Sequence, residues 1–514
     1  MEGTVYSLLP ALIMLVLVLL TRKIFLSLGA GIFVGALLLH NFHLIDSLKE
    51  IVMVFWNIFY LSEEGWNLGN LYLLGFLLLL GITTAFLSAS GGSKAFGDWA
   101  IRQVKTRRGA QLIPSFLGII IFIDDYFNSL AVGQVARPVT DRFKVSRAKL
   151  AYIIDSTSAP ITVITPISSW GAYIIGTLGS IFATAEVTAY QPLEAFVRMI
   201  PLNFYAFAAI LMVFLVAYFN LNIGLMRKHE ERAIATGELF DQEKGNIAGD
   251  AETSLTAHTN GRIHHLLVPI GSLILVTVSA MLVTGYRATN GQATILTMFE
   301  NTNVNLSLFV GGLAAVMVAF IFFVPLSFPK VSVSKIIKEG IQAMLPAIYI
   351  LILAWMIGAI INAIGTGDYL AELIEQVAFN TNYLAFLLFM ISGIMALATG
   401  TSWGTFGMML PIAAQIALVY DVTLVLPAMA AVLAGSVFGD HCSPISDTSI
   451  LSSTGAGANH IDHVLTQLPY ALLSALATGL GYFVYGFLGS VMLSLCVTIV
   501  CVVLIATITY KIIK

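Results

Sequence analysis

The sequence predicts an all-α polytopic membrane protein, with about 11 transmembrane helices plus two re-entrant hairpins in two inverted-topology repeats. Three observations predict this class. The chain of 514 residues is 58% hydrophobic and only 10% charged, whereas a soluble domain carries roughly 25% charged residues. Apolar runs long enough to cross a bilayer recur along the chain. Basic residues fall in a few separate loops, and the alternating pattern of β-barrel strands does not occur.

Composition also argues against several other classes. The formal net charge is −3 and no basic block occurs, so no nucleic-acid partner is expected. Cys442, Cys496 and Cys501 all lie in predicted spans, which disfavours a disulfide framework or a thiolate metal cluster. The first apolar run, residues 8–20, lacks a basic segment before it and a small-residue cleavage site after it. We therefore expect a retained span rather than a signal peptide.

The distribution of basic residues predicts the orientation of the loops. By the positive-inside rule, the N-terminus is expected outside and the C-terminus in the cytoplasm. The loops expected in the cytoplasm are residues 22–23, 102–108, 137–149, 227–262 and 330–338, with Lys511 and Lys514. The loops expected outside are those around Glu63, Glu186, Glu300, Glu372 and Asp421.

Two apolar stretches fit this orientation only as hairpins. The loops at 102–108 and 137–149 are both basic, so the stretch between them must enter and leave on the cytoplasmic side. We expect its hairpin near 110–136, with a tip near residues 124–128. Residues 383–420 are broken at 399–404 and carry no basic residue, which predicts a second hairpin that enters from outside.

The two halves of the chain resemble each other weakly. Gly81 matches Gly358, the break at Asp124 matches that at Thr401, and residues 155–162 resemble 440–446. Such repeats, when inverted, are typical of secondary transporters. The expected domains are an N-terminal scaffold (1–70), a first repeat (71–225), a cytoplasmic linker (226–265), connecting scaffold spans (266–339), a second repeat (340–487) and a C-terminal span (488–514).

Four polar segments interrupt the apolar sequence, at 124–128, 155–162, 399–405 and 440–448. We expect all four to be unwound and to lie near one another, because half-helix ends and free carbonyls bind ions in transporters. No lysine or arginine occurs between Lys338 and Lys511, so no local cation neutralises the carboxylates of the last segment. The candidate cation- or proton-binding residues are Asp155, Asp440, Asp447, Asp124, Asp125, Asn128, Ser156, Thr157, Thr162, Thr401, Ser402, Ser443 and Ser446. Of these, Asp155, Asp440, Thr401 and Ser402 are the candidate Na+ ligands, since hard cations prefer oxygen.

Each candidate also has a structural interpretation. Asp155 and Asp440 could cap broken helices. Asp124 and Asp125 are adjacent, so we expect at most one of them to face the site and the other to pair with a basic residue such as Arg137.

Four nearby residues leave similar alternatives open. Trp403 is a candidate gate and His441 a candidate proton relay, although packing roles would explain both. His460 and His463 are expected at a solvated cytoplasmic turn. The pair His441 and Cys442 comes with neither a nucleophile elbow nor a metal motif, so no enzymatic activity is expected.

Several long stretches resemble the NhaC-type sodium/proton antiporter family. They are residues 122–129, 137–146, 151–156, 400–404, 438–448 and 466–470. The resemblance covers most of the membrane core, from about residue 70 to 485. It implies a transporter of the bacterial inner membrane, in which a hairpin-bearing domain moves against a scaffold in an elevator-type cycle, often within a homodimer.

The residues and the resemblance together predict sodium/proton antiport by alternating access. Cation and proton would compete for buried carboxylates, because burial without a basic partner raises their affinity for either ion. The alternative is a sodium- or proton-coupled exchanger of a small organic solute such as a carboxylate, amino acid or amine. No cofactor is expected beyond the transported Na+ and H+, and the lipid bilayer is the other expected partner.

Overall fold

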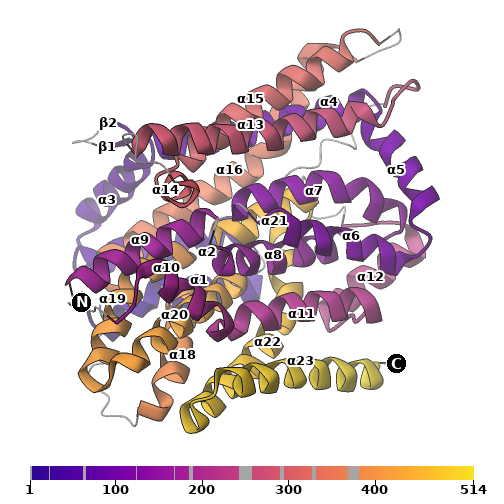
Figure 1. Cartoon of the computed structure of the whole chain (residues 1–514). Coiled ribbons are helices and arrows are strands. Elements are labelled where there is room, and N and C mark those ends of the chain that lie inside the picture. The colour runs from indigo at the N-terminus through magenta and orange to yellow at the C-terminus, as the bar shows by residue number, and fades with distance from the viewer. Residues whose placement is uncertain are drawn as a thin grey trace.

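The computed structural model describes residues 3–21, 23–61, 65–122, 124–166, 168–184, 189–241, 257–289, 294–326, 331–366, 369 and 381–513. Glu63, Glu186 and Glu372, which were used to predict outer loops, lie outside these ranges. Within them the chain is almost entirely helical (Figure 1), with one short antiparallel ribbon in which β1 (Tyr60–Leu61) pairs with β2 (Gly65–Trp66).

The helices follow one another with short breaks. The N-terminal half holds η1 (Val5–Leu8), α1 (Leu9–Thr21), α2 (Ile24–Leu39), α3 (Leu44–Asn57), α4 (Leu68–Ala89), α5 (Gly92–Gln103), α6 (Arg107–Ile120), α7 (Asp125–Arg142), α8 (Arg147–Ile164), α9 (Ser169–Thr184), α10 (Pro192–Met199), η2 (Ile200–Leu202) and α11 (Phe204–Phe219). The C-terminal half holds α12 (Leu225–Thr236), α13 (His264–Ala288), α14 (Ile295–Glu300), α15 (Val304–Phe323), α16 (Val333–Ala363), η4 (Thr381–Tyr383), α18 (Leu384–Thr399), α19 (Ser402–Tyr420), η5 (Val422–Leu424), α20 (Val425–Cys442), α21 (Asp447–Ala456), α22 (His460–Leu488) and α23 (Val491–Ile513).

The length and apolar character of these helices confirm a multi-pass membrane protein. The described residues contain nine helices that could cross a membrane, or up to eleven if each of two bent pairs forms one span. The bent pairs are α8 with α9, at 42°, and α10–η2 with α11, at 48°. Two of the nine, α18 and α19, are the arms expected for the second hairpin. The inverted repeats and the elevator motion stay predictions.

Helices α6 and α7 fold back on each other as a hairpin. At its open end, the Arg107 guanidinium donates a hydrogen bond of 3.0 Å to the carbonyl of Lys144, just beyond α7. At its tip, the Asn128 amide donates to the carbonyls of Gly118 and Ile121, both at 2.6 Å. Asn128 therefore holds the tip together by satisfying the last carbonyls of α6, which have no partner within the helix.

Helices α18 and α19 form the second hairpin. Thr381 and Thr423, beyond its two outer ends, line one small pocket, so these ends lie together. At the tip, Gly400 ends α18 with a φ of +72°. A Cβ at this position would overlap the Ile445 side chain, so the turn requires glycine on both counts.

The expectation that residues 155–162 are unwound is wrong. They lie in the continuous helix α8, and the chain breaks only after Ile164. The polar side chains fit the helix because they bond carbonyls of the preceding turn. The Thr157 hydroxyl donates to Ile153 and the Thr162 hydroxyl to Ser158. The other breaks are shorter than expected, at residues 121–124, 400–401 and 443–446.

The predicted linker contains an ordered helix, α12, which is tied to the open end of the first hairpin. The fully buried Glu230 carboxylate lies 2.6 Å from the Arg107 guanidinium and 3.3 Å from the Lys149 ammonium, and it accepts a hydrogen bond of 2.8 Å from the Ser146 amide. Burial alone would raise the pKa of Glu230, but the two positive charges outweigh it and hold the pKa below its usual value.

Glu230→Gln is expected to destabilise the protein by about 3 kcal/mol, because it leaves two cations without their buried counter-charge. Thermal unfolding of the purified protein in detergent measures this. The stabilisation by Glu230 is present above the carboxyl pKa of the unfolded chain and is lost as the pH falls through the lower folded pKa. The deficit should therefore be constant near neutrality and shrink only below about pH 4. Glu231→Gln is the matched control, since its pair with Arg227 is exposed; equal destabilisation by both changes would contradict the prediction.

Candidate functional site

A polar cavity of about 670 Å³ lies where the tips of the two hairpins meet. The first hairpin contributes residues 124–126, the second contributes Thr401 and Trp403, and the broken helix α20–α21 contributes Asp447. The opposite wall comes from the N-terminal part of α4, from α16 and from the loop before α15. The full lining consists of Asn70, Leu73, Asp124, Asp125, Tyr126, Asn301, Thr302, Asn303, Val304, Asn305, Trp355, Thr401, Trp403 and Asp447.

Both carboxylates of the first tip face this cavity. Asp124 caps α7 by accepting from the Phe127 amide at 2.9 Å, and its second oxygen accepts from the Ser169 hydroxyl at 2.8 Å. Asp125 accepts from the Trp170 indole at 2.8 Å through Oδ1. Its Oδ2 is buried without a hydrogen-bond partner among the described residues. Asp125 thus retains an open acceptor.

The expectation that at most one of these two carboxylates faces the site is therefore wrong. Asp124 has an extended backbone, whereas Asp125 is the first helical residue, and this change of direction brings both side chains to the cavity. Their donors come from the start of α9 rather than from Arg137. That residue lies about three turns further along α7, against Gly457.

The broken helix α20–α21 carries the other two candidate carboxylates. Asp447, the first residue of α21, is half-buried and accepts a hydrogen bond of 2.6 Å from the Tyr126 hydroxyl. Asp440 is buried and accepts from the Thr448 hydroxyl at 3.0 Å. Only Asp447 of this pair lines the cavity.

The tip of the second hairpin presents one hydroxyl and one indole to the cavity. Thr401 begins α19 and its side chain makes no capping hydrogen bond, so its oxygen is available to a ligand. Trp403 packs edge-on against Trp170 and Tyr173, with ring centroids 5.5 and 4.8 Å apart. The Ser402 hydroxyl instead donates to the carbonyl of Ser436 at 3.2 Å.

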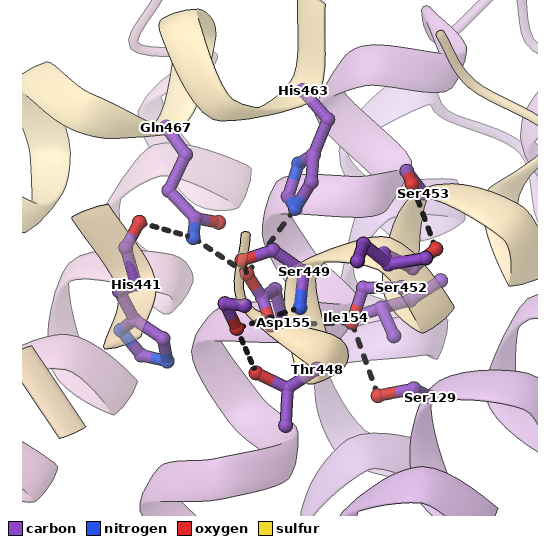
Figure 2. Close-up of polar contacts among 12 residues, drawn as sticks. Ser129, Ile154, Asp155, His441, Thr448, Ser449, Ser452, Ser453, His463 and Gln467 are labelled. Carbon is purple, nitrogen blue, oxygen red and sulfur yellow. Dashed lines mark hydrogen bonds and ion pairs between the residues drawn. The ribbon is translucent and has the colours of Figure 1, made fainter. Parts of the chain in front are cut away.

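Asp155 lies outside the cavity lining, in a separate buried network (Figure 2). Its carboxylate accepts from Ser449 at 2.8 Å and from Ser452 at 3.2 Å, both on α21. From α22 it accepts from Gln467 at 2.6 Å and from His463 at 3.2 Å. The four proposed Na+ ligands therefore do not form one set in this structure, because Asp155 and Asp440 face other partners than Thr401.

The expectation that His460 and His463 are solvated is wrong. His463 is fully buried, and the His460 ring lies 2.7 Å from the carbonyl of Pro444. The first turn of α22, which begins at His460, packs inside the helix bundle rather than in a loop. Both residues are therefore part of the buried polar core.

The remaining candidates mostly serve the backbone. The His441 ring lies 3.0 Å from the Tyr205 hydroxyl, and its carbonyl accepts from Gln467 at 3.0 Å. Ser443 donates to the carbonyl of Leu397 at 2.9 Å, and Ser446 caps α21. Ser156 is buried in α8.

The charge of the cavity is uncompensated. None of the described residues that line it is basic, and three are carboxylates. Within the described ranges, no three His, Cys, Asp or Glu side chains converge closely enough to hold a metal ion. The carboxylates thus form an anionic lining rather than a finished coordination shell. Such a lining attracts cations and protons, and it suits weak, reversible binding.

Sequence reasoning missed several residues of this region. Ser169 and Trp170 were not singled out because no charge marks them, and the wall from Asn301 to Asn305 lies in a loop far from the other motifs. Tyr126 lay inside a quoted stretch without an assigned role. The spacing of His463 and Gln467, four residues apart in a predicted span, was a usable signal, because it puts both on one helix face.

A multi-pass helical bundle with an anionic cavity at the meeting point of two helix breaks defines a membrane transporter of the antiporter class. The model of the Na+/H+ antiporter family matches residues 130–487. A Haemophilus influenzae protein described as uncharacterized is 46% identical over 493 residues, 95% of this chain and 92% of its own. The chain belongs to the Na+/H+ antiporter family, a family of cation/proton antiporters, which confirms the resemblance seen in the sequence.

Two further relatives match shorter parts of the chain. An uncharacterized Na+/H+ antiporter of Haemophilus influenzae is 36% identical over 156 residues, 29% of this chain and 32% of its own. The malate-2H+/Na+-lactate antiporter of Bacillus subtilis is 31% identical over 195 residues, 37% of this chain and 40% of its own. Antiporters with different named substrates are thus similar to this chain.

Proposed function

We propose that the protein exchanges Na+ for H+ by alternating access, with the cation bound at the carboxylates of the cavity. Asp125 and Asp447 supply negative charge, and Thr401 supplies a neutral oxygen. Oxygen ligands of these kinds suit a hard monovalent cation. A cation and a proton would each neutralise the same buried charge, so binding of one favours release of the other.

The proposal is supported above all by one observation: three carboxylates line one cavity, and no basic residue lies among its described lining residues. Charge at membrane depth is costly unless it is paired. A bound cation or proton would reduce this cost, so the empty and doubly loaded states are both disfavoured. That condition is what couples two opposing fluxes.

The arrangement of the hairpins supports the alternating-access part of the proposal. One hairpin opens toward the linker side and the other toward the side of Asp421, with their tips at the cavity. We place the linker side in the cytoplasm of a bacterial inner membrane, with the N-terminus outside. The wall at Asn301–Asn305 then lies on the outer side, so the described state would open outward. Movement of the hairpins against α4, α15 and α16, in an elevator-type cycle, would expose the cavity to the cytoplasm.

Proteoliposomes that contain the purified protein and a trapped pH-sensitive dye test the exchange. Addition of Na+ outside should make the lumen alkaline within seconds, and K+ with valinomycin distinguishes electrogenic from electroneutral exchange. Protein-free liposomes are the control. An absence of any Na+-dependent pH change in correctly oriented, folded protein would contradict sodium/proton antiport.

The size of the cavity favours a second candidate function, exchange of a small organic solute coupled to Na+ or H+. Its volume of about 670 Å³ lies within the range of small-molecule sites, and far exceeds the need of one dehydrated ion. The carboxylate lining suits an amine, or an organic anion that enters with Na+. Counterflow of a labelled amine or carboxylate, without a response to Na+ alone, would favour this candidate.

A further inference from the structure

A pair of ionisable side chains lies outside the cavity and is not used by the proposed cation site. Asp155 on α8 and His463 on α22 are both fully buried, with His463 Nε2 3.2 Å from Asp155 Oδ2. A buried ionisable pair is costly to keep in a membrane protein. We propose that this pair is a second proton-binding site, distinct from the cation cavity, at which one proton of the exchange is carried.

The hydrogen bonds of the pair leave one position open to a proton. A carboxylate only accepts, so Nε2 of His463 must carry the hydrogen that points to Asp155. In the neutral ring Nδ1 is then an unprotonated acceptor, and it is buried without a partner among the described residues. A proton that arrives there forms an N–H bond and gives an imidazolium, which the adjacent carboxylate stabilises. When that bond breaks, the neutral pair of Figure 2 is restored.

The surroundings hold Asp155 as a carboxylate rather than as the proton acceptor. Ser449, Ser452 and Gln467 donate to it in addition to His463. Three donors besides the imidazole satisfy both oxygens, and such bonds favour the charged form of a carboxyl. The imidazole is therefore the group of the pair whose charge changes.

Other charged groups around the pair are few or already paired. On α8 itself, Arg147 is bonded to Asp141 and Lys149 to Glu230. On α12 and α22, His229 lies 4.0 Å from Asp462. The groups that interact electrostatically with the pair are Asp440 and His441 on α20, Tyr205 on α11 and His460 on α22, while α7 faces the network with Ser129.

The short helix α21 links this pair to the cation cavity. Its first residue, Asp447, lines the cavity, and its residues Ser449 and Ser452 bond Asp155. Asp447 and Ser452 are five positions apart, a rise of about 7.5 Å along the helix. A cation at Asp447 and a proton at His463 thus repel each other across low-dielectric protein and share one rigid element. Occupancy of one site lowers the affinity of the other.

The pair also lies toward the side from which a cytoplasmic proton would arrive. The end of α21 is held by Arg147, whose guanidinium donates to the carbonyl of Ala456 at 3.1 Å. Asp155 is eight residues beyond Arg147 on α8, about 12 Å of helix. The pair therefore lies between the linker side of the protein and the cavity.

This inference rests on the proposed Na+/H+ antiport, and the test separates the two. Exchange of 22Na+ for Na+ across proteoliposomes, with equal pH on both sides, gives the half-saturating Na+ concentration from pH 6 to 9. The slope of its logarithm against pH counts the protons displaced per Na+ bound. His463→Gln keeps an amide donor toward Asp155 but takes up no proton, so the slope should fall by about one. His43→Gln, at an exposed histidine, should leave the slope as in the wild type.

Each outcome has one meaning. An unchanged slope in His463→Gln would overturn the inference while leaving antiport intact, and loss of all 22Na+ exchange in a correctly assembled His463→Gln protein would overturn the separation of the two sites. No exchange in the wild type would instead refute the proposed function.

A milder change covers the case in which His463→Gln fails to assemble. Ser452→Ala removes one donor from the Asp155 carboxylate, so the imidazolium should be favoured and the pH of half-maximal exchange should rise by about one unit. Thr454→Val is the matched control, because its hydroxyl on the same helix bonds only the Ile450 carbonyl. An equal or absent shift in Ser452→Ala and Thr454→Val would overturn the inference.

Discussion

Asp125→Asn is expected to lower Na+-dependent proton flux by about 100-fold or more. The asparagine keeps the shape of the side chain and an oxygen that accepts from the Trp170 indole. It removes the negative charge and the open acceptor Oδ2 that lie at the cavity. At an effective dielectric constant near 20, a charge at about 4 Å from a cation is worth about 4 kcal/mol, which corresponds to roughly a thousandfold in binding.

The measurement is the initial rate of lumen alkalinisation in proteoliposomes, over a range of Na+ concentrations. Asp421→Asn is the control, because this exposed aspartate beyond α19 only caps the turn at Thr423, a role that asparagine also fills. If Asp125→Asn transported Na+ like the wild type, the cation site would have to be sought away from the first hairpin tip.

Gly133→Ala is expected to destabilise the protein by about 1–3 kcal/mol and to lower exchange at least tenfold. Helix α7 crosses α21 at this point, and a Cβ on Gly133 would overlap the backbone carbonyl of Gly455. Backbone cannot give way as a flexible side chain can, so the two helices must separate. Their first residues, Asp125 and Asp447, both line the cavity, and a displacement of about 1 Å between binding groups costs on the order of 100-fold in activity.

Gly271→Ala on α13 is the matched control. No atom lies within 4 Å of a Cβ built there, and alanine is the better helix former by about 1 kcal/mol. Thermal unfolding should therefore show opposite signs for the two glycine changes. A Gly133→Ala protein as stable and active as the wild type would mean that α7 and α21 do not pack this closely.

Much of the architecture could be predicted from the distribution of charge along the chain. The basic loops on both sides of residues 110–136 required a stretch that turns back, and α6 and α7 do so. The absence of basic residues from 383–420 pointed to the second hairpin in the same way. Charge patterning works here because moving a basic loop across a bilayer is costly, whatever the packing inside the protein.

The exact position of each break could not be predicted, because it depends on hydrogen bonds between neighbouring turns. Residues 155–162 carry an aspartate, four hydroxyls and a proline, a composition that suits an unwound segment. In α8 these hydroxyls return to the backbone of the same helix, and Asp155 finds its donors on α21 and α22. Those helices are about 300 positions away, as the separation of 308 between Asp155 and His463 shows, so no local pattern could reveal them.

The first turn of α22 was misjudged for a different reason. His460, Asp462 and His463 look like a solvated turn because three polar residues follow a glycine-rich segment. The decisive pattern lies further on, since His463, Gln467 and Tyr470 recur at helical spacing and are all buried on one face. Polar periodicity within a span indicates a buried network, whereas single polar residues do not.

The ion pair between Arg107 and Glu230 has a consequence for the biosynthesis of the protein. The two residues are 123 positions apart, and Glu230 is added after the whole first hairpin. At about 5–20 residues per second, the ribosome needs roughly 6–25 seconds to reach it. During this interval Arg107 and Lys149 have no carboxylate to neutralise them, so α6 and α7 can be held only by their own backbone contacts. Insertion of the linker helix would then close the hairpin as a late step of assembly.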